Sequence, residues 1–218
     1  MQIFIGKLVA VIAEHFLRRH WQQLREALAS EYSKHQREQE YTPSLMLQKL
    51  LISGEDHRYF QHPGFDLIAI CRAIWRRLAW GVREGASTIE MQIVRVLTGR
   101  YEITLSRKIR EILLATLVTR VIPKNEIPAI YIKIAYFGWR MNGYKQACKR
   151  LNLHHYSMSL EDSAALIARL KYPEPRIPPF KRLTQIINRR DHLIKLYRKH
   201  IKKDVYALLG GKVAYESI

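Results

Sequence analysis

Residues 54 to 64 read Gly-Glu-Asp-His-Arg-Tyr-Phe-Gln-His-Pro-Gly, and this stretch separates two apolar segments. The spacing of the apolar residues predicts one helix over 43–52 and another over 67–80. Between them lie two carboxylates and two histidines, and the closing Pro-Gly pair is typical of a turn. The stretch is therefore predicted to be a loop on a helical scaffold, where site residues often lie. A carboxylate flanked there by apolar walls could act as a general base, and a solvated polar loop is the alternative.

The composition places the chain among folded, helical proteins. It has 218 residues, of which 48% are hydrophobic, enough to bury the core of one sizeable domain. Apolar residues recur mostly at helical spacing, and the short Asn-Gly or Asp-Gly turns that join alternating strands are missing. We therefore expect an all-α (mainly α) fold.

The charge and the cysteines restrict the possible partners. Lys and Arg total 37 against 19 Asp and Glu, a formal net charge of +18, so an anionic partner is expected. Nucleic acid, anionic lipid headgroups and a phosphorylated substrate all meet this condition. Two cysteines do not make a disulfide framework, and Cys71 and Cys148 are both predicted to be buried free thiols. The Cys and His spacing does not predict a metal site.

The N-terminal region carries an apolar patch over 3–13, which is too short to span a bilayer and is followed by basic residues. It is a poor signal peptide, because no small-residue cleavage site follows. It could form an interfacial amphipathic helix or an ordinary helix packed on the domain. A helix followed by a loop is expected over 21–41. Thr42 and Pro43 then look like the N-cap and first position of the helix that leads to residue 52.

A second polar cluster begins at Ser87. Ser87 with Glu90 three residues on predicts a capping box at the start of a helix. Thr88, Gln92 and Arg95 follow at positions i, i+4 and i+7, so they would share one helical face. The positive end of the helix dipole beside them suits an anion, and a capped surface helix with a polar stripe is the alternative.

A third cluster centres on Glu111, in a helix predicted over 106–121. Arg107 and Lys108 precede Glu111 by four and three residues, so both cations can reach its carboxylate. A carboxylate at the edge of a buried helix beside two cations would stay ionised. The alternative is an exposed helical ion pair of little energetic weight.

Helical segments are also predicted before and after the remaining turns. Asp66 is expected to cap the helix over 67–80, and Ser159 the amphipathic helix over 159–170. Residues 127–137 form an aromatic and apolar stretch, and further helical segments are expected over 144–151 and 183–201.

Taken together, these clusters resemble the peptidoglycan glycosyltransferase domain (glycosyltransferase family 51). Its first motif, Glu-Asp-x-x-Phe-x-x-His-x-Gly, is matched by Glu55, Asp56, His62 and Gly64. Its second, Gly-Gly-Ser-Thr-Ile-Thr-Gln-Gln-Leu-x-Lys-Asn, is matched in part over 85–96. Its third, Arg-Lys-x-x-Glu, is matched by Arg107, Lys108 and Glu111, and weaker similarity continues from Lys124 to residue 195.

The resemblance implies an all-α, lysozyme-like fold with a larger head and a smaller membrane-facing jaw. It implies polymerisation of lipid II into glycan strands, with inversion and with undecaprenyl pyrophosphate as the leaving group. Glu55 would be the general base that deprotonates the acceptor hydroxyl, and Glu111 the second catalytic glutamate near the donor. The residues implied in substrate binding are Asp56, His62, Ser87, Thr88, Gln92, Arg95, Arg107, Lys108 and Lys124.

The resemblance also sets expectations about cofactors and location. A divalent cation, magnesium or manganese, could lie at the pyrophosphate. The expected partners are lipid II, the growing strand and an anionic membrane surface, without nucleic acid. The expected location is the outer, periplasmic face of the cytoplasmic membrane. The chain is expected to be monofunctional, with an N-terminal segment over 1–42, a transferase domain over 43–200 and a tail over 201–218.

Departures from the family patterns leave other readings open. They suggest a divergent branch, and they also suit a degenerate relative that binds lipid II or the cell wall without catalysis. A lysozyme-like hydrolase and a nucleic-acid-binding module are further alternatives. The departures are Tyr59 for Phe, Ala86 for Gly, Glu90 for Thr, Met91 for Gln, Arg95 for Lys, Val96 and Lys133 for Asn, and Ala129 for Glu.

Overall fold

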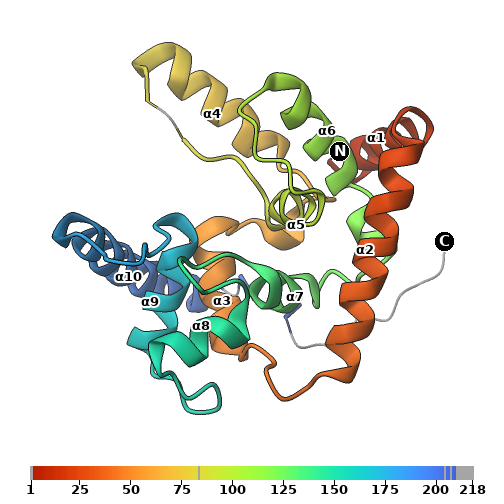
Figure 1. Ribbon diagram of the computed structural model, residues 1–218. Helices are drawn as coiled ribbons and strands as arrows, with labels where there is room; N and C mark the ends of the chain where they lie inside the picture. The colour runs from red at the N-terminus through yellow and green to blue at the C-terminus, as the bar shows by residue number, and fades with distance from the viewer. Residues whose placement is uncertain (1, 83, 204, 207, 210–218) are drawn as a thin grey trace. The chain divides into compact units, whose positions relative to one another are not determined.

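The computed structural model describes residues 2–82, 84–203, 205–206 and 208–209. Over these residues the chain forms ten α-helices, two 3-10 turns and isolated bridges, so the predicted all-α fold is confirmed (Figure 1). Most of the predicted tail over 201–218 lies outside the described residues. The elements are α1 (Gln2–Phe16), α2 (Arg18–Arg37), α3 (Leu45–Glu55), η1 (Tyr59–Gln61), α4 (Leu67–Trp80), α5 (Ile89–Thr98), α6 (Leu105–Ala115), η2 (Val118–Arg120), α7 (Ile127–Ile134), α8 (Tyr144–Leu151), α9 (Leu160–Lys171) and α10 (Phe180–Ile201).

The chain divides into two compact units, each made of two separate segments. The first unit comprises residues 1–33 and 58–124, and the second comprises 34–57 and 125–218. Residues 54 to 64 therefore contain the point where the chain leaves the second unit and returns to the first. The predicted three-part division at residues 42 and 200 remains a prediction.

In the first unit, α1 and α5 both pack against α6. The face that α1 buries is made of small residues, with Ala10 and Ala13 inside and Gly6 against Pro63. The large apolar side chains of α1 point the other way and are exposed. They are Phe4, Leu8, Val11, Ile12 and Phe16. Within the part of the chain that the structure describes, no helix has both the length and the apolar character needed to cross a bilayer.

The second unit is built on α3, α9 and α10, with α7 and α8 alongside. Its core contains fully buried leucines such as Leu50 of α3, Leu166 of α9 and Leu193 of α10. Gly54 of α3 packs tightly against α10, since an added Cβ there would lie 2.3 Å from Leu193 Cδ2. A side chain at position 54 would therefore separate α3 from α10, and this close contact fixes the end of α3.

Several predicted caps are confirmed. The Asp66 carboxylate accepts hydrogen bonds from the backbone N–H groups of Ile68 and Ala69, and α4 spans the predicted residues 67–80. Ser159 Oγ accepts from Asp162 N at the start of α9. These caps could be predicted from the sequence because the capping side chain and the backbone N–H groups that it binds lie within three residues of each other.

Other predicted boundaries are wrong. Ser44, not Thr42, caps α3, with its Oγ accepting from Leu47 N, and the helix continues three residues beyond Ile52 to Glu55. The predicted loop therefore begins with a helical end and also contains the turn η1. The helix predicted over 106–121 ends at Ala115, because the backbone then tightens into 3-10 hydrogen bonds, with Leu117 N donating to Leu114 O and Arg120 N to Leu117 O.

Two side-chain predictions are also corrected. Ser87 and Glu90 do not form a capping box, since Thr88 caps α5 by accepting a hydrogen bond from Met91 N. Cys148 is buried as expected, but Cys71 is exposed, because α4 buries only Ala69 along its length.

Candidate active site

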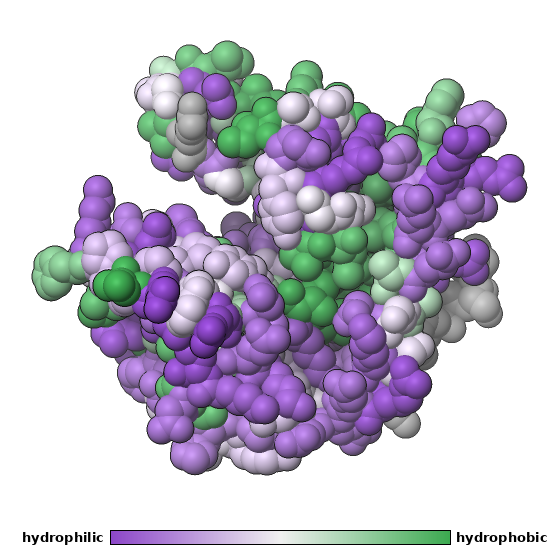
Figure 2. All heavy atoms as spheres, in the orientation of Figure 1, coloured by the Kyte–Doolittle hydropathy of each residue, from purple (hydrophilic) through white to green (hydrophobic). Residues whose placement is uncertain are grey.

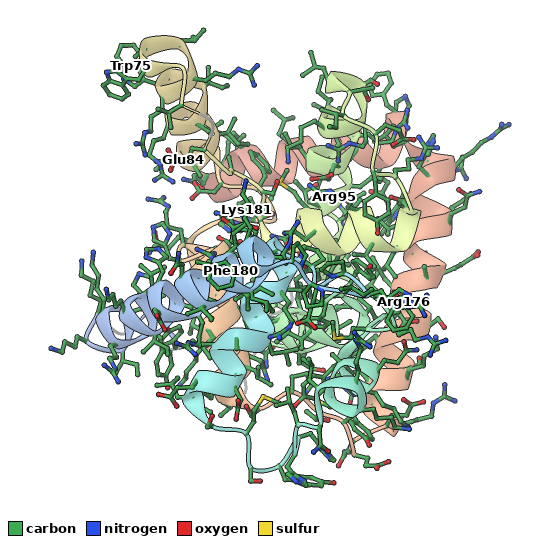
Figure 3. The ribbon with its side chains drawn as sticks, turned by 60° about the vertical axis from the view of Figure 1, so that its left-hand side comes forward. Trp75, Glu84, Arg95, Arg176, Phe180 and Lys181 are labelled. Carbon is green, nitrogen blue, oxygen red and sulfur yellow. The ribbon has the colours of Figure 1, made fainter. Side chains whose placement is uncertain are left out.

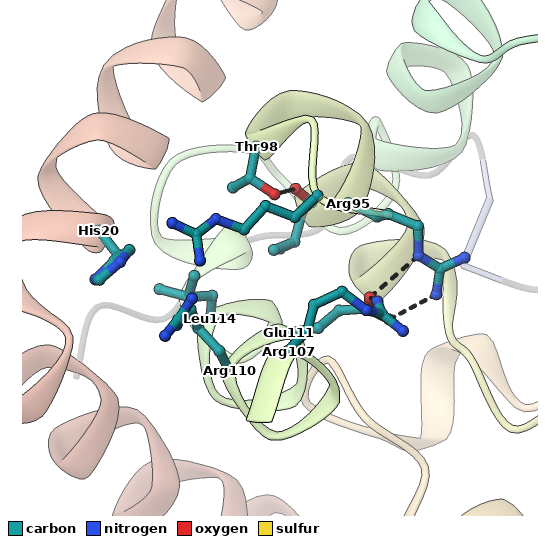
Figure 4. Close-up of a pocket in the computed structure, with 9 residues that line it drawn as sticks. His20, Arg95, Thr98, Arg107, Arg110, Glu111 and Leu114 are labelled. Atoms are coloured by element: carbon teal, nitrogen blue, oxygen red, sulfur yellow. Dashed lines mark hydrogen bonds and ion pairs between the residues drawn. The ribbon is translucent and has the colours of Figure 1, made fainter. Parts of the chain in front are cut away.

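Glu111 is the centre of a cationic cluster in the first unit. Its carboxylate is only 3% exposed and accepts hydrogen bonds from Arg95, at 2.8 Å and 3.1 Å, and from Lys108 Nζ, at 3.1 Å. Arg107 reaches the same carboxylate from one helical turn earlier. Figure 4 shows Arg95 of α5 directed to Glu111 of α6. The packing of these two helices therefore adds a third cation to the two that the sequence predicted.

The balance of charge in this cluster keeps the carboxylate ionised. Burial alone would raise the pKa of Glu111, but hydrogen bonds and positive charges from Arg95 and Lys108 outweigh it and hold the pKa below its usual value. Burial lowers the pKa of Lys108, and Glu111 partly opposes this shift. Three cations share one carboxylate, so the cluster retains positive charge for an anionic group.

Ser87 belongs to the same cluster. Its Oγ accepts a hydrogen bond from Lys108 Nζ at 2.8 Å and lies 3.4 Å from Arg95 Nη2. The neighbouring Thr88 is buried and donates its hydroxyl hydrogen to Gly64 O at 2.6 Å. Gln92 is half-buried on α5. Thr88 thus ties the start of α5 to the glycine that closes the first motif, and this holds Ser87 beside the cations.

Lys124 and His62 meet in a second, buried arrangement of the first unit. The Lys124 ammonium pairs with the fully buried Glu90, donates to His62 O at 3.0 Å, and lies 4.1 Å from the centre of the Tyr59 ring. His62 Nδ1 accepts from Gly64 N at 3.3 Å. Lys124 therefore links the first motif to the second, while its predicted contact with substrate remains a prediction.

Glu55 and Asp56 lie in the second unit, at the end of α3. Arg189 of α10 donates from Nη2 to Glu55 Oε1 at 3.0 Å and to Gly54 O at 2.7 Å. Glu55 keeps 19% of its side chain exposed, whereas Asp56 is buried and forms the C-cap. Glu55 is thus held on a rigid helical end and is still reachable by a small polar group.

Sequence reasoning missed Arg189. It follows Glu55 by 134 residues and is one of many basic residues on α10, so no local signal distinguishes it. The role of Glu90 was also missed, because its partner Lys124 lies 34 residues away.

Several departures from the family motifs have a structural explanation. Glu90 pairs with Lys124, Met91 and Ala129 are buried, and Lys133 donates to Glu38 O at 2.7 Å. Val96 has no such explanation.

The Glu111 cluster does not fit a divalent cation. Both carboxylate oxygens already accept from cationic side chains, and magnesium or manganese would prefer several free oxygen ligands. Three positive side chains would also repel it. The positive charge suited to a diphosphate is supplied here by Arg95, Arg107 and Lys108.

Comparison with known proteins identifies the group to which these motifs belong. Penicillin-binding protein 1A of Rickettsia typhi is 30% identical over 161 residues, that of Vibrio cholerae serotype O1 is 32% identical over 163, and that of Aquifex aeolicus is 34% identical over 146. These matches cover 70%, 72% and 66% of this chain but 20%, 19% and 20% of the relatives, so the chain spans about a fifth of their length. The model of the transglycosylase family matches residues 21–198. The resemblance found in the motifs is therefore confirmed, and the chain belongs to the transglycosylase family.

Proposed function

We propose that the chain is a peptidoglycan glycosyltransferase that polymerises lipid II with inversion at the anomeric carbon. The observation that carries this proposal is the Glu111 cluster, whose three cations hold more positive charge than one carboxylate neutralises. A diphosphate leaving group gains negative charge as its bond to the sugar breaks. Cations held in place before the reaction stabilise that charge without reorganisation.

In this proposal Glu55 is the general base. Its carboxylate accepts the proton of the acceptor's 4-hydroxyl group as that oxygen forms a bond to the donor's anomeric carbon. The bond from the anomeric carbon to the diphosphate oxygen breaks, and undecaprenyl pyrophosphate departs with the electron pair. Arg95, Arg107 and Lys108 bind the diphosphate, and Glu111 holds these three side chains in place. Arg189 orients Glu55.

The proposal is tested with labelled lipid II in detergent, with chain length read on a gel. Wild type should form glycan strands, and Glu55→Gln should lower the rate by about 100-fold or more, as expected for loss of a general base. Glu40→Gln removes an exposed carboxylate of the same unit and should leave the rate unchanged.

Polymerisation by Glu55→Gln at the wild-type rate would refute the base assignment. A folded wild type that binds lipid II without forming strands would instead identify a non-catalytic relative. The expectation that the protein is monofunctional, with glycosyl transfer as its sole activity, remains a prediction.

We also propose that the first unit rests on the outer face of the cytoplasmic membrane. The outward stripe of α1 includes Phe4 and Phe16, each 76% exposed. On α4, Leu78 is 80% exposed, and Figure 3 shows Trp75 projecting from this helix. Figure 2 shows hydrophobic side chains gathered over α4 and α6. Large exposed apolar surfaces of this kind suit an interfacial location, and the chain's positive charge suits anionic lipids.

A further inference from the structure

A hollow in the first unit is lined by basic side chains that the Glu111 cluster does not use. They are His20 of α2, Arg100 after α5, and Arg110 of α6. The hollow opens to solvent, and Val94 and Leu114 contribute apolar side chains to its lining.

The arginines of the hollow fall into two groups. Arg95 and Arg107 also line it, but they are paired with Glu111. Figure 4 shows Arg110 extending to the other side, toward His20. Among the described residues, neither Arg100 nor Arg110 has a carboxylate within ion-pair distance, and Arg110 Nε is buried without a hydrogen-bond partner. A buried donor left unpaired is unfavourable, so an anionic ligand that reaches it would stabilise this arrangement.

The segment that joins the two arginines indicates what kind of anion would bind. Between Arg100 and Arg110 the chain exposes four large apolar side chains. They are Tyr101 (62%), Ile103 (100%), Leu105 (76%) and Ile109 (50%). Guanidinium groups bind phosphate oxygens in a bidentate manner, and exposed apolar side chains on the segment between the two arginines favour a ligand with an attached hydrocarbon. A free phosphate ion would gain nothing from those side chains.

We propose that the hollow formed by His20, Arg100 and Arg110 binds the phosphate of an anionic phospholipid headgroup. The exposed residues between Arg100 and Arg110 would then enter the boundary between headgroups and acyl chains. The lipid would hold the first unit at the membrane surface, next to the cations of the Glu111 cluster. This inference rests on the proposed membrane location, and none of its three residues belongs to the predicted catalytic or substrate-binding set.

The test is isothermal titration of the whole protein with dihexanoylphosphatidylglycerol below its critical micelle concentration. Dihexanoylphosphatidylcholine and inorganic phosphate are the comparison ligands. Saturable one-to-one binding of the anionic lipid is expected, about tenfold or more tighter than either comparison ligand, a difference of about 1.4 kcal/mol. The double variant Arg100→Gln/Arg110→Gln should weaken binding by about tenfold or more. The matched variant Arg19→Gln/Arg77→Gln removes two exposed arginines of the same unit and should change affinity less than about twofold.

Equal losses in the two double variants would overturn the proposal, because they would indicate general charge attraction. Inorganic phosphate that binds as tightly as the lipid and competes with it would overturn the lipid assignment and leave a free-anion site. If the double variant does not fold, nuclear magnetic resonance of the wild type decides the question. The ring signals of His20 should move on lipid addition while those of the exposed His154 stay in place, and an unmoved His20 would refute the proposal.

These measurements use no lipid II, so their outcome is separate from that of the polymerisation gel. A positive titration with no glycan strands would remove the polymerase proposal alone.

Discussion

At the residue scale, Glu111 links stability to pH. Its pKa is lowered in the folded state, so its contribution to the free energy of unfolding is fully present above the unfolded pKa and is lost as pH falls through the folded pKa. Glu111→Gln should lower the free energy of unfolding by about 3 kcal/mol at pH 7, near the low end for a broken buried pair because the cations are partly exposed. Urea unfolding should show the difference from wild type shrinking below about pH 4. Glu102→Gln, at an exposed site, is the control, and a difference that stays constant from pH 3 to 7 would contradict this account.

Arg189 gives a second prediction at this scale. Its guanidinium fixes both Glu55 and the last turn of α3 through the Gly54 carbonyl. Arg189→Ala should therefore lower kcat for strand formation by about tenfold or more, and Arg189→Lys should recover part of the loss, because it keeps the charge without the planar fork. kcat is measured at a temperature where both variants are folded. A difference in stability alone would then leave kcat unchanged. Equal kcat for wild type and Arg189→Ala would exclude a positioning role.

At the element scale, the docking of α1 depends on the absence of a side chain at Gly6. An alanine Cβ there would lie 2.3 Å from Pro63 Cγ. Alanine would normally stabilise a helix by about 1 kcal/mol relative to glycine, so the contact predicts a change of the opposite sign. Gly6→Ala should lower the free energy of unfolding by about 1–3 kcal/mol, as measured in urea. Lys7→Ala, one residue away and exposed, should cause little change, and stabilisation by Gly6→Ala would mean that α1 is not held against Pro63.

The same scale shows why some features could be predicted and others could not. Asp66 and Ser159 were found as caps because the groups they bind lie within three residues in sequence. The close packing of Gly64 on the last turn of α6 could not be predicted, because Gly64 lies about fifty residues before Ala115 in the chain. In the candidate site, the Arg107 and Lys108 contacts with Glu111 follow from helical spacing. The Arg95 and Arg189 contacts arise from helix packing, which no local pattern encodes.

At the scale of the whole molecule, the exposed apolar residues predict which tryptophans meet a membrane. Trp75 and Trp80 belong to the first unit and are 64% and 66% exposed. Trp139 belongs to the second unit, where the guanidinium carbons of Arg140 and Arg150 lie 4.5 Å and 4.7 Å from its ring centre. Since arginines cover its ring, Trp139 should remain outside the acyl region when the protein binds vesicles.

Single-tryptophan variants test this difference, with the other tryptophans changed to Phe. On vesicles that contain phosphatidylglycerol and a brominated lipid, fluorescence of variants retaining Trp75 or Trp80 should be quenched, and that of the variant retaining Trp139 should not. Raising the salt concentration should weaken vesicle binding, because the +18 charge contributes through screened attraction, but it should not change quenching of the bound fraction. Equal quenching at all three positions would mean that the protein does not present its first unit to the bilayer. Absence of quenching at Trp75 and Trp80 would limit the interaction to surface charge, and the exposed apolar residues of α4 would then require a protein partner.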